Sequence, residues 1–316
     1  MIAKANGSGT QSSIQSLDSA LIDLLHSPVG AQIFASLSES EVADTALRLY
    51  RQDLHSCAAA ARMALQLVHG TDPGDDLVAA HVQHLLWSSW RTAQAEASLG
   101  TRPCWTATGT HFLEETRGKP TIFITPLTMP FSDVQVVIDQ LIPDRPVAVY
   151  GEGLASAQTD APSPGRPLTI FGDGSPRTML GIVRILACNG VFCTYPDFVY
   201  RGHAEVSRTL FGRPRKLSRA FLSLCSRPGA CLLPVLLTRD PGLWHATIYE
   251  PVILHDIGSL PRESSEKLLA TIVLDMLEGL ISTRPEQWLL LSTLVAQVCD
   301  ELSPAHQFIP EGKVIA

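Results

Sequence analysis

Basic side chains are concentrated in one stretch of an otherwise acidic chain. Residues 201–227 include seven basic residues and a single acidic one, Glu205, although the 316-residue chain has a formal net charge of −7. The basic residues are Arg201, Arg208, Arg213, Arg215, Lys216, Arg219 and Arg227. Arginine guanidinium groups bind phosphate through paired hydrogen bonds, so we expect Arg201, Arg213 and Arg215 to bind a phosphate-bearing substrate. The alternative is a basic surface that contacts only water.

Two further arginines precede this stretch on a predicted helix, residues 176–187, which has proline in its first turn. Arg177 and Arg184 are seven residues apart, which is two helical turns, so their side chains can point the same way. We expect both to bind substrate, with a solvated basic face again as the alternative.

The histidine and cysteine residues show no metal-binding pattern. His81 and His84 lie three residues apart beside Trp87 and Trp90, but no acidic residue or cysteine stands at ligand spacing. We therefore expect packed or surface histidines. The seven cysteines include no C-x-x-C pair and are expected to be reduced.

Common nucleotide-binding and hydrolase motifs are not present. Gly151-Glu-Gly153 follows a predicted strand, but a proline-rich segment rather than a helix comes next, so a plain turn is expected. The sequence has no G-x-S-x-G, Walker A or H-E-x-x-H motif. Nothing in its composition favours a nucleic-acid partner.

The sequence predicts two regions after a disordered tail at residues 1–12. Residues 13–100 are expected to be all helical. In this region a helix over residues 13–26 stops at Ser27-Pro28, and a capping box of Ser38 and Glu41 starts a helix that runs to Arg51. Residues 101–316 alternate predicted strands with helices, which indicates an α/β domain with a central mixed sheet flanked by helices.

The elements of the α/β domain follow from short apolar runs and longer helical segments. The predicted strands are residues 121–125, 147–150, 168–171, 191–195, 231–237 and 244–249. The predicted helices are residues 133–141, 176–187, 263–281 and 285–302. A polar-alternating run ends at Leu210-Phe211-Gly212, and a short basic helix is expected after it. Two buried strands thus flank a cationic insert, and α/β proteins usually hold anionic ligands beside such a sheet.

Three blocks of sequence carry a family resemblance. They are Tyr195-Pro196-Asp197 with Leu210-Phe211-Gly212-x-Pro214, then Gly229-Ala-Cys-Leu-Leu-Pro-Val235, and finally Arg284-Pro-Glu-Gln-Trp288 at the end of a long predicted helix. With these blocks the chain resembles the lauroyl and myristoyl acyltransferases of lipid A biosynthesis, within the lysophospholipid acyltransferase superfamily. The resemblance covers roughly residues 105–295 and does not extend to residues 1–100.

The resemblance implies a catalytic pair after the first core strand. The family uses a histidine there to deprotonate the acceptor, and an acidic residue five positions later orients that histidine. In this chain Asp133 stands at the acidic position and Thr128 stands at the position of the histidine. A threonine hydroxyl is a poor base, and general-base assistance contributes ~10²–10⁴ in rate.

Three interpretations of Thr128 remain open. The chain is an inactive relative kept for binding, or a transferase whose acceptor needs no strong base, or a transferase whose base lies elsewhere. For the last, the candidates are His111, His203 and His245. His203 ranks first because it lies in the cationic insert, and a solvated loop histidine is the alternative.

The resemblance also implies how a substrate is held. The family has arginines on the helix before the 191–195 strand, and Arg177 and Arg184 match them. Asp197 matches a further acidic position of the family, where it orients an arginine such as Arg184 or Arg201, or only caps the turn. The implied acyl donor is a thioester of coenzyme A or of phosphopantetheine on an acyl carrier protein. No tightly bound cofactor and no metal are expected.

The expected protein has no transmembrane segment and is cytoplasmic. No apolar segment reaches the ~18 residues that a bilayer requires, and the N-terminal residues have no apolar core, although the lipid A enzymes begin with a membrane-anchoring helix. The expected function is a soluble acyltransferase-like protein of specialised metabolism that moves an acyl group to an amine or hydroxyl acceptor. The alternative is a catalytically inactive relative that binds an acyl thioester or acts as a scaffold.

Overall fold

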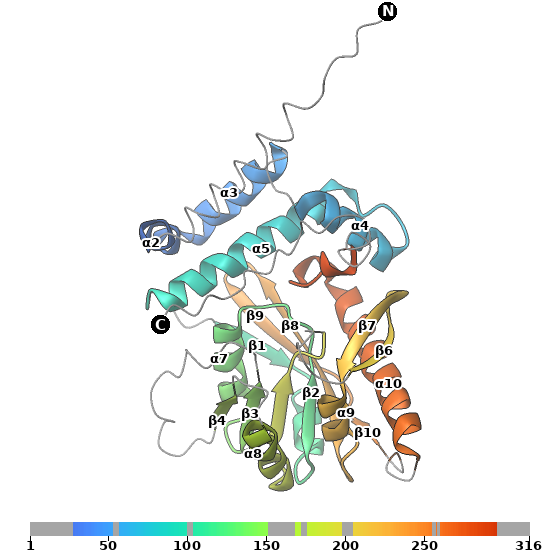
Figure 1. Ribbon diagram of the computed structural model, residues 1–316. Coiled ribbons are helices and arrows are strands. Elements are labelled where there is room, and N and C mark those ends of the chain that lie inside the picture. The colour runs from blue at the N-terminus through green and yellow to red at the C-terminus, as the bar shows by residue number, and fades with distance from the viewer. Residues whose placement is uncertain are drawn as a thin grey trace, which may run out of the picture. The chain divides into compact units, whose positions relative to one another are not determined.

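The computed structural model describes residues 28–52, 57–99, 104–150, 168–171, 176–197, 205–254, 257 and 260–295. The described residues form two compact units, one within residues 28–99 together with 291–295, the other within residues 104–290. The first unit is helical, and the second is a mixed sheet flanked by helices (Figure 1). The predicted fold class, an α/β domain preceded by a helical region, is confirmed.

The helical unit is organised around α5 (Gly74–Glu96), which contacts α2 (Pro28–Ser36), α3 (Glu39–Arg51) and α4 (Cys57–His69). The predicted capping box starts α3: the Ser38 hydroxyl accepts the Glu41 N–H, and the Glu41 carboxylate accepts the Ser38 N–H. The sequence did not predict α2. Pro28 begins this helix. Proline suits the first helical position, because an N–H there would have no acceptor within the helix.

The paired histidines of α5 are packing residues. His81 and His84 are both buried, and the His84 ring stacks on Trp87 with 5.9 Å between ring centroids. The expectation of packed histidines is confirmed for this pair. No group of three or more His, Cys, Asp or Glu side chains suited to a metal ion occurs in the described part of the chain.

Among the described residues of the α/β unit, seven strands lie side by side in the order β1-β9-β8-β2-β5-β3-β4, and β10 pairs with the start of β8. Their bounds are β1 Trp105–Thr108, β2 Thr121–Ile124, β3 Val147–Tyr150, β4 Leu168–Phe171, β5 Val191–Thr194, β8 Cys231–Asp240, β9 Leu243–Ile248 and β10 Val252–Ile253. The five strands from β8 to β4 are parallel, β9 is antiparallel to β8, and β1 is parallel to β9. The strands β2, β3 and β5 are entirely buried, which is why they are continuous apolar runs in the sequence.

Helices connect these strands and cover the sheet. They are α6 (His111–Glu115), α7 (Phe131–Leu141), α8 (Pro176–Ala187), α9 (Arg219–Cys225) and α10 (Arg262–Thr283). Helix α8 contacts β3 and β5, and α10 contacts β2 and β8. The helix predicted over residues 285–302 is not continuous: a short 3-10 helix, η3 (Pro285–Gln287), comes first and residues 293–295 are helical again, while residues 296–302 lie outside the described residues. None of the helices in the described ranges combines the length and apolar character needed to cross a membrane.

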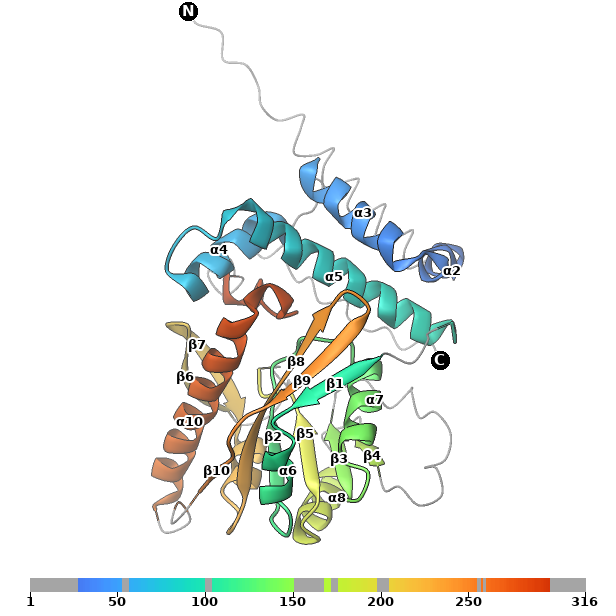
Figure 2. The ribbon, with the colours of Figure 1, turned by 180° about the vertical axis from the view of Figure 1, so that it is seen from behind.

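The cationic insert contains a β-hairpin where the sequence predicted a basic helix. Strands β6 (Glu205–Leu210) and β7 (Arg213–Ser218) pair antiparallel, and the helix α9 begins only at Arg219. Phe211 and Gly212 form the two-residue turn with φ of 51° and 71°, the positive values that suit the twist of a hairpin. The Phe211 N–H donates to the Glu278 carboxylate on α10, which holds the turn. The hairpin lies beside α10 in both views (Figures 1 and 2).

Candidate functional site

Three segments leave the sheet at one edge. Ile124 at the end of β2 pairs with Thr194 at the end of β5, so residues 125–130 and Tyr195-Pro196-Asp197 start next to each other. The neighbouring strand β8 pairs with Ile124 at Pro234 and then continues to Asp240. Ligands of parallel α/β sheets bind outside the carboxyl ends of the strands, so this edge is where a site is expected.

Asp197 is the centre of the polar contacts at this edge. Its side chain is fully buried, and the Oδ2 atom accepts hydrogen bonds from the Leu127 N–H at 2.9 Å and the Trp288 indole Nε1–H at 2.6 Å. The guanidinium of Arg215, itself buried, donates to the Asp197 carbonyl oxygen. These partners are far from Asp197 in the sequence, so the contacts join the segment after β2, the hairpin and the residues after α10.

Burial and hydrogen bonding act in opposite directions on the Asp197 carboxyl. Burial raises its pKa, because a charged carboxylate loses its water shell, whereas the Leu127 N–H, the Trp288 indole and the Arg215 charge lower the pKa. The net effect is a raised pKa. Burial also lowers the pKa of the Arg215 guanidinium, while Asp197 raises it. Asp197 therefore takes up a proton more readily than an exposed aspartate.

We expect the Asp197→Asn variant to reveal this raised pKa in its stability. A raised carboxyl pKa means that the folded protein binds the proton more tightly than the unfolded chain, whose aspartates titrate near pH ~3.9. The stability of the wild type relative to Asp197→Asn should therefore be highest below pH ~4 and should fall as the pH rises through the folded pKa, by at most ~1.4 kcal/mol per pH unit. Urea unfolding of both proteins across this pH range measures the difference. A difference that stays flat, or that grows with pH, would contradict the raised pKa.

Residues 284–289 hold this edge of the sheet together. Arg284 pairs with Asp240 at the end of β8 at 2.9 Å. The Gln287 amide donates to the Arg239 carbonyl and accepts the Arg239 N–H, both at 2.7 Å, as a neighbouring strand would. The Leu289 N–H donates to the Leu127 carbonyl at 2.9 Å. The block that carries the resemblance at Arg284–Trp288 is thus a connector between β8, the segment after β2 and Asp197.

Thr128 and Asp133, the catalytic pair that the resemblance implies, both follow strand β2. Thr128 is in the segment between β2 and α7, and Asp133 is the third residue of α7. The Thr128 side chain is 1% exposed, and its hydroxyl donates to the Leu237 carbonyl of β8 at 2.6 Å. The hydroxyl proton is donated to a backbone oxygen, and the protonated form of a hydroxyl is too strong an acid to exist near neutral pH. The Thr128 hydroxyl therefore does not act as a general base.

Neither His111 nor His245, the candidate histidines that the structure describes, is hydrogen-bonded to Thr128, Asp197 or Arg215. His203 and Arg201 both lie outside the described residues. In His245 on β9, Nδ1 lies 2.8 Å from the Thr106 hydroxyl and Nε2 lies 3.1 Å from the Thr108 hydroxyl, so both ring nitrogens are hydrogen-bonded. His111 starts α6, which leads into the amino end of β2 and so lies toward the opposite edge.

The predicted substrate-binding arginines separate into two groups. Arg177 and Arg184 are exposed on α8, which runs back from the carboxyl edge to the amino edge because it joins the parallel strands β4 and β5. Arg184 therefore lies about 10 Å further from the carboxyl edge than Arg177. Arg213 and Arg215 lie on β7, and Arg215 contacts Asp197. The structure thus brings Arg215, Asp197 and the segment bearing Thr128 together, and it leaves Arg184 away from them.

Sequence reasoning missed two of the groups that contact Asp197. The Trp288 indole belongs to a block that the resemblance singled out, but only the contact shows that its N–H serves Asp197. A buried tryptophan needs a hydrogen-bond acceptor, which is the signal that could have paired them. The Leu127 N–H is a backbone group, and no side-chain pattern marks it.

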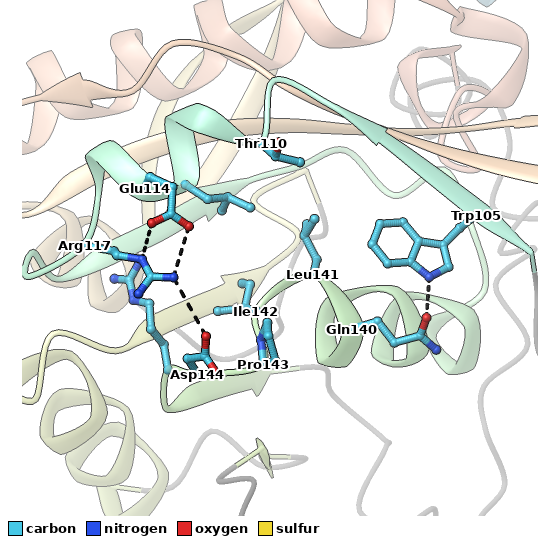
Figure 3. A pocket seen from close by; sticks show the side chains of 11 residues that line it. Trp105, Thr110, Glu114, Arg117, Gln140, Leu141, Ile142, Pro143 and Asp144 are labelled. Carbon is cyan, nitrogen blue, oxygen red and sulfur yellow. Dashed lines mark hydrogen bonds and ion pairs between the residues drawn. The ribbon is translucent and has the colours of Figure 1, made fainter.

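A cavity of about 340 Å³ lies at the opposite edge of the sheet, near the amino ends of β2 and β3. Figure 3 shows the Trp105 indole donating to Gln140 and the Arg117 guanidinium lying between Glu114 and Asp144. None of the predicted site residues lines this cavity. Because Trp105 pairs with Gln140 and Arg117 pairs with Glu114 and Asp144 along its lining, we regard the cavity as a structural feature.

Comparison with known proteins adds no assignment. No protein-family model matches the chain. No curated protein matches it either. The acyltransferase resemblance rests on the sequence blocks alone, and the geometry around Asp197 is the structural observation to set beside them.

Proposed function

We propose that the protein binds an acyl thioester at the carboxyl edge of its sheet and moves the acyl group to an amine or hydroxyl acceptor in the cytoplasm. The observation that supports this proposal is the convergence on Asp197. Its Oδ2 atom joins Leu127, beside the position of the family histidine, to Trp288 of the closing block. Segments that the resemblance picked out separately in the sequence therefore meet at one point, as parts of a single site would.

The transfer step fits an acceptor that needs no strong base. A neutral amine attacks the thioester carbonyl carbon, the new C–N bond forms as the C–S bond breaks, and the amine proton passes to water as the thiolate leaves. The protein's part is to hold the two reactants in line, which alone can supply much of the barrier reduction. The Leu127 N–H is not an oxyanion donor in this arrangement, because Asp197 already accepts it.

A specific observation favours a second candidate, a non-catalytic acyl-thioester-binding protein. The Thr128 hydroxyl is buried and bonded to the Leu237 carbonyl, so the position that carries the base in the resembled enzymes has a structural contact here. Binding without turnover would then be the function of the same edge of the sheet.

Turnover of acyl thioesters by the purified protein separates the two candidates. We expect acyl-coenzyme A and a panel of amines and alcohols to give an acylated product by mass spectrometry, with equimolar release of free thiol. Trp288→Phe should lower this rate by ~10-fold or more, because it removes a contact that positions Asp197 and the segment after β2. Arg117→Gln, which changes an exposed residue at the opposite edge, serves as the control. Thioester binding without any product would establish the second candidate.

A further inference from the structure

The β6–β7 hairpin has an inner and an outer face. The inner residues are Val206, Arg208 and Leu210 of β6 with Arg213, Arg215 and Leu217 of β7, and all of them are buried or half-buried. The outer residues Ser207, Thr209, Pro214 and Lys216 are exposed. Three of the six inner positions are therefore arginines, on the side of the hairpin that faces the protein.

The register places these arginines close together. Arg208 pairs directly with Arg215 across the two strands, and Arg213 lies two residues before Arg215 on the same face. Side chains of directly opposed residues start about 5 Å apart, and like charges in such a pair are destabilising. Arg215 already contacts Asp197, so the arrangement favours a ligand of opposite charge chiefly at Arg208 and Arg213.

Two of these arginines have no acidic partner among the described residues. Arg208 donates to the carbonyl of its neighbour Ser207 at 2.8 Å, and neither Arg208 nor Arg213 forms an ion pair with a described residue. The Glu205 carboxylate pairs with Lys216 on the outer face at 2.9 Å. The connecting residues 198–204 contain no acidic residue in their sequence.

We propose that the inner face of the hairpin is a phosphate-binding site formed by Arg208, Arg213 and Arg215. Three guanidinium groups can surround one phosphate with paired hydrogen bonds, and a phosphate between Arg208 and Arg215 replaces their repulsion by attraction. Arg208 is the residue that the sequence patterns did not single out. Arg215 links this site to Asp197 through the carbonyl contact. The phosphate is that of the acyl donor, an assignment that rests on the proposed function, whereas anion binding by the hairpin does not.

Calorimetric titration of the full chain with inorganic pyrophosphate tests the anion site without any thioester. Arg208→Gln and Arg213→Gln should each weaken binding by about 10-fold or more, and binding to the wild type should weaken as salt rises. The matched control is Lys216→Gln, which removes the same charge from the outer face of the same hairpin and should change affinity less than twofold. Equal losses for Lys216→Gln and Arg208→Gln would overturn the proposal, because only the overall charge would then matter.

The stability of Arg208→Gln separates a binding role from a structural one. Without ligand, this variant should unfold about 1–2 °C higher than the wild type, because a like-charge pair is relieved. Pyrophosphate should raise the unfolding midpoint of the wild type and have little effect on the variant. A variant that is less stable and retains its pyrophosphate affinity would show that Arg208 is structural and would overturn the site.

Titrations with larger ligands distinguish the source of the phosphate and separate this inference from the proposed function. Free coenzyme A, phosphopantetheine and phosphate-free pantetheine form the series. If coenzyme A binds ~10-fold or more tightly than phosphopantetheine, the donor is a coenzyme A thioester, and equal binding of the two indicates a carrier-linked donor. Pyrophosphate binding without acyl transfer would rule out the proposed function and support the phosphate site. If pyrophosphate does not bind and acyl transfer is as fast from acyl-pantetheine as from acyl-coenzyme A, the phosphate site is ruled out and the proposed function is supported.

Discussion

Replacing Trp288 by phenylalanine is expected to destabilise the protein by about 2–4 kcal/mol. The Trp288 side chain is fully buried, and its indole N–H is one of the two donors to the Asp197 Oδ2 atom. A hydrogen bond to a charged group contributes ~1.5–3 kcal/mol, and the smaller ring leaves an unfilled volume in addition. Guanidinium chloride unfolding measures the loss.

The chain offers a matched control for this substitution. The Trp105 indole also donates to a side chain, but the acceptor is the neutral amide of Gln140 at a partly exposed position. Trp105→Phe should therefore cost less than ~1 kcal/mol. A double-mutant cycle of Trp288→Phe with Asp197→Asn should show coupling of ~1 kcal/mol or more. If the two tryptophan variants lose the same stability, the Asp197 contact has no special importance.

Placing a histidine at position 128 is expected to create or raise thioester turnover by up to ~10². An imidazole accepts a proton at neutral pH, and Asp133 lies five residues further along, at the position of the family's carboxylate. The position is 1% exposed and the Thr128 hydroxyl binds the Leu237 carbonyl, so the larger ring costs ~1–3 kcal/mol in stability. Release of free thiol from an acyl thioester measures the rate.

A second substitution, added to the Thr128→His variant, tests whether residues 128 and 133 act as a pair. Asp133→Asn should erase the gain of Thr128→His, since the amide cannot hold the imidazole as the carboxylate does. Should Thr128→His have no effect while His203→Ala abolishes an activity of the wild type, the base lies in the insert. Thioester binding by all of these variants without any turnover would favour the non-catalytic candidate.

The parts of the fold that sequence predicted well are those with strong local signals. The strands β2, β3 and β5 are apolar runs because both faces of the sheet are covered, and α8 has the predicted bounds. The prediction of a helix directly after Gly212 was wrong, because the residues of this segment are compatible with both a helix and a strand. Its strand form depends on pairing with β6 and on burial of Arg215 and Leu217, which are tertiary effects.

The sequence singled out residues of the candidate site, but it did not predict the contacts between them. Asp197 and the Arg284–Trp288 block were identified from their resemblance, yet no local pattern indicates that an indole and a backbone N–H meet on one carboxyl oxygen. The proposed phosphate site shows the same limit. Arg208, Arg213 and Arg215 are visible as charges, but their common face depends on the hairpin register.

The division of the chain into units has a consequence for its synthesis on the ribosome. Residues 291–295 belong to the helical unit, although they follow residues 104–290 of the α/β unit, and Leu291 and Leu294 are buried. The helices made first therefore lack part of their apolar cover until the last of these residues emerges. At 5–20 residues per second, translation of the intervening stretch takes roughly 10–40 s. During that time the nascent helical unit exposes an apolar surface, which is the kind of surface that chaperones bind.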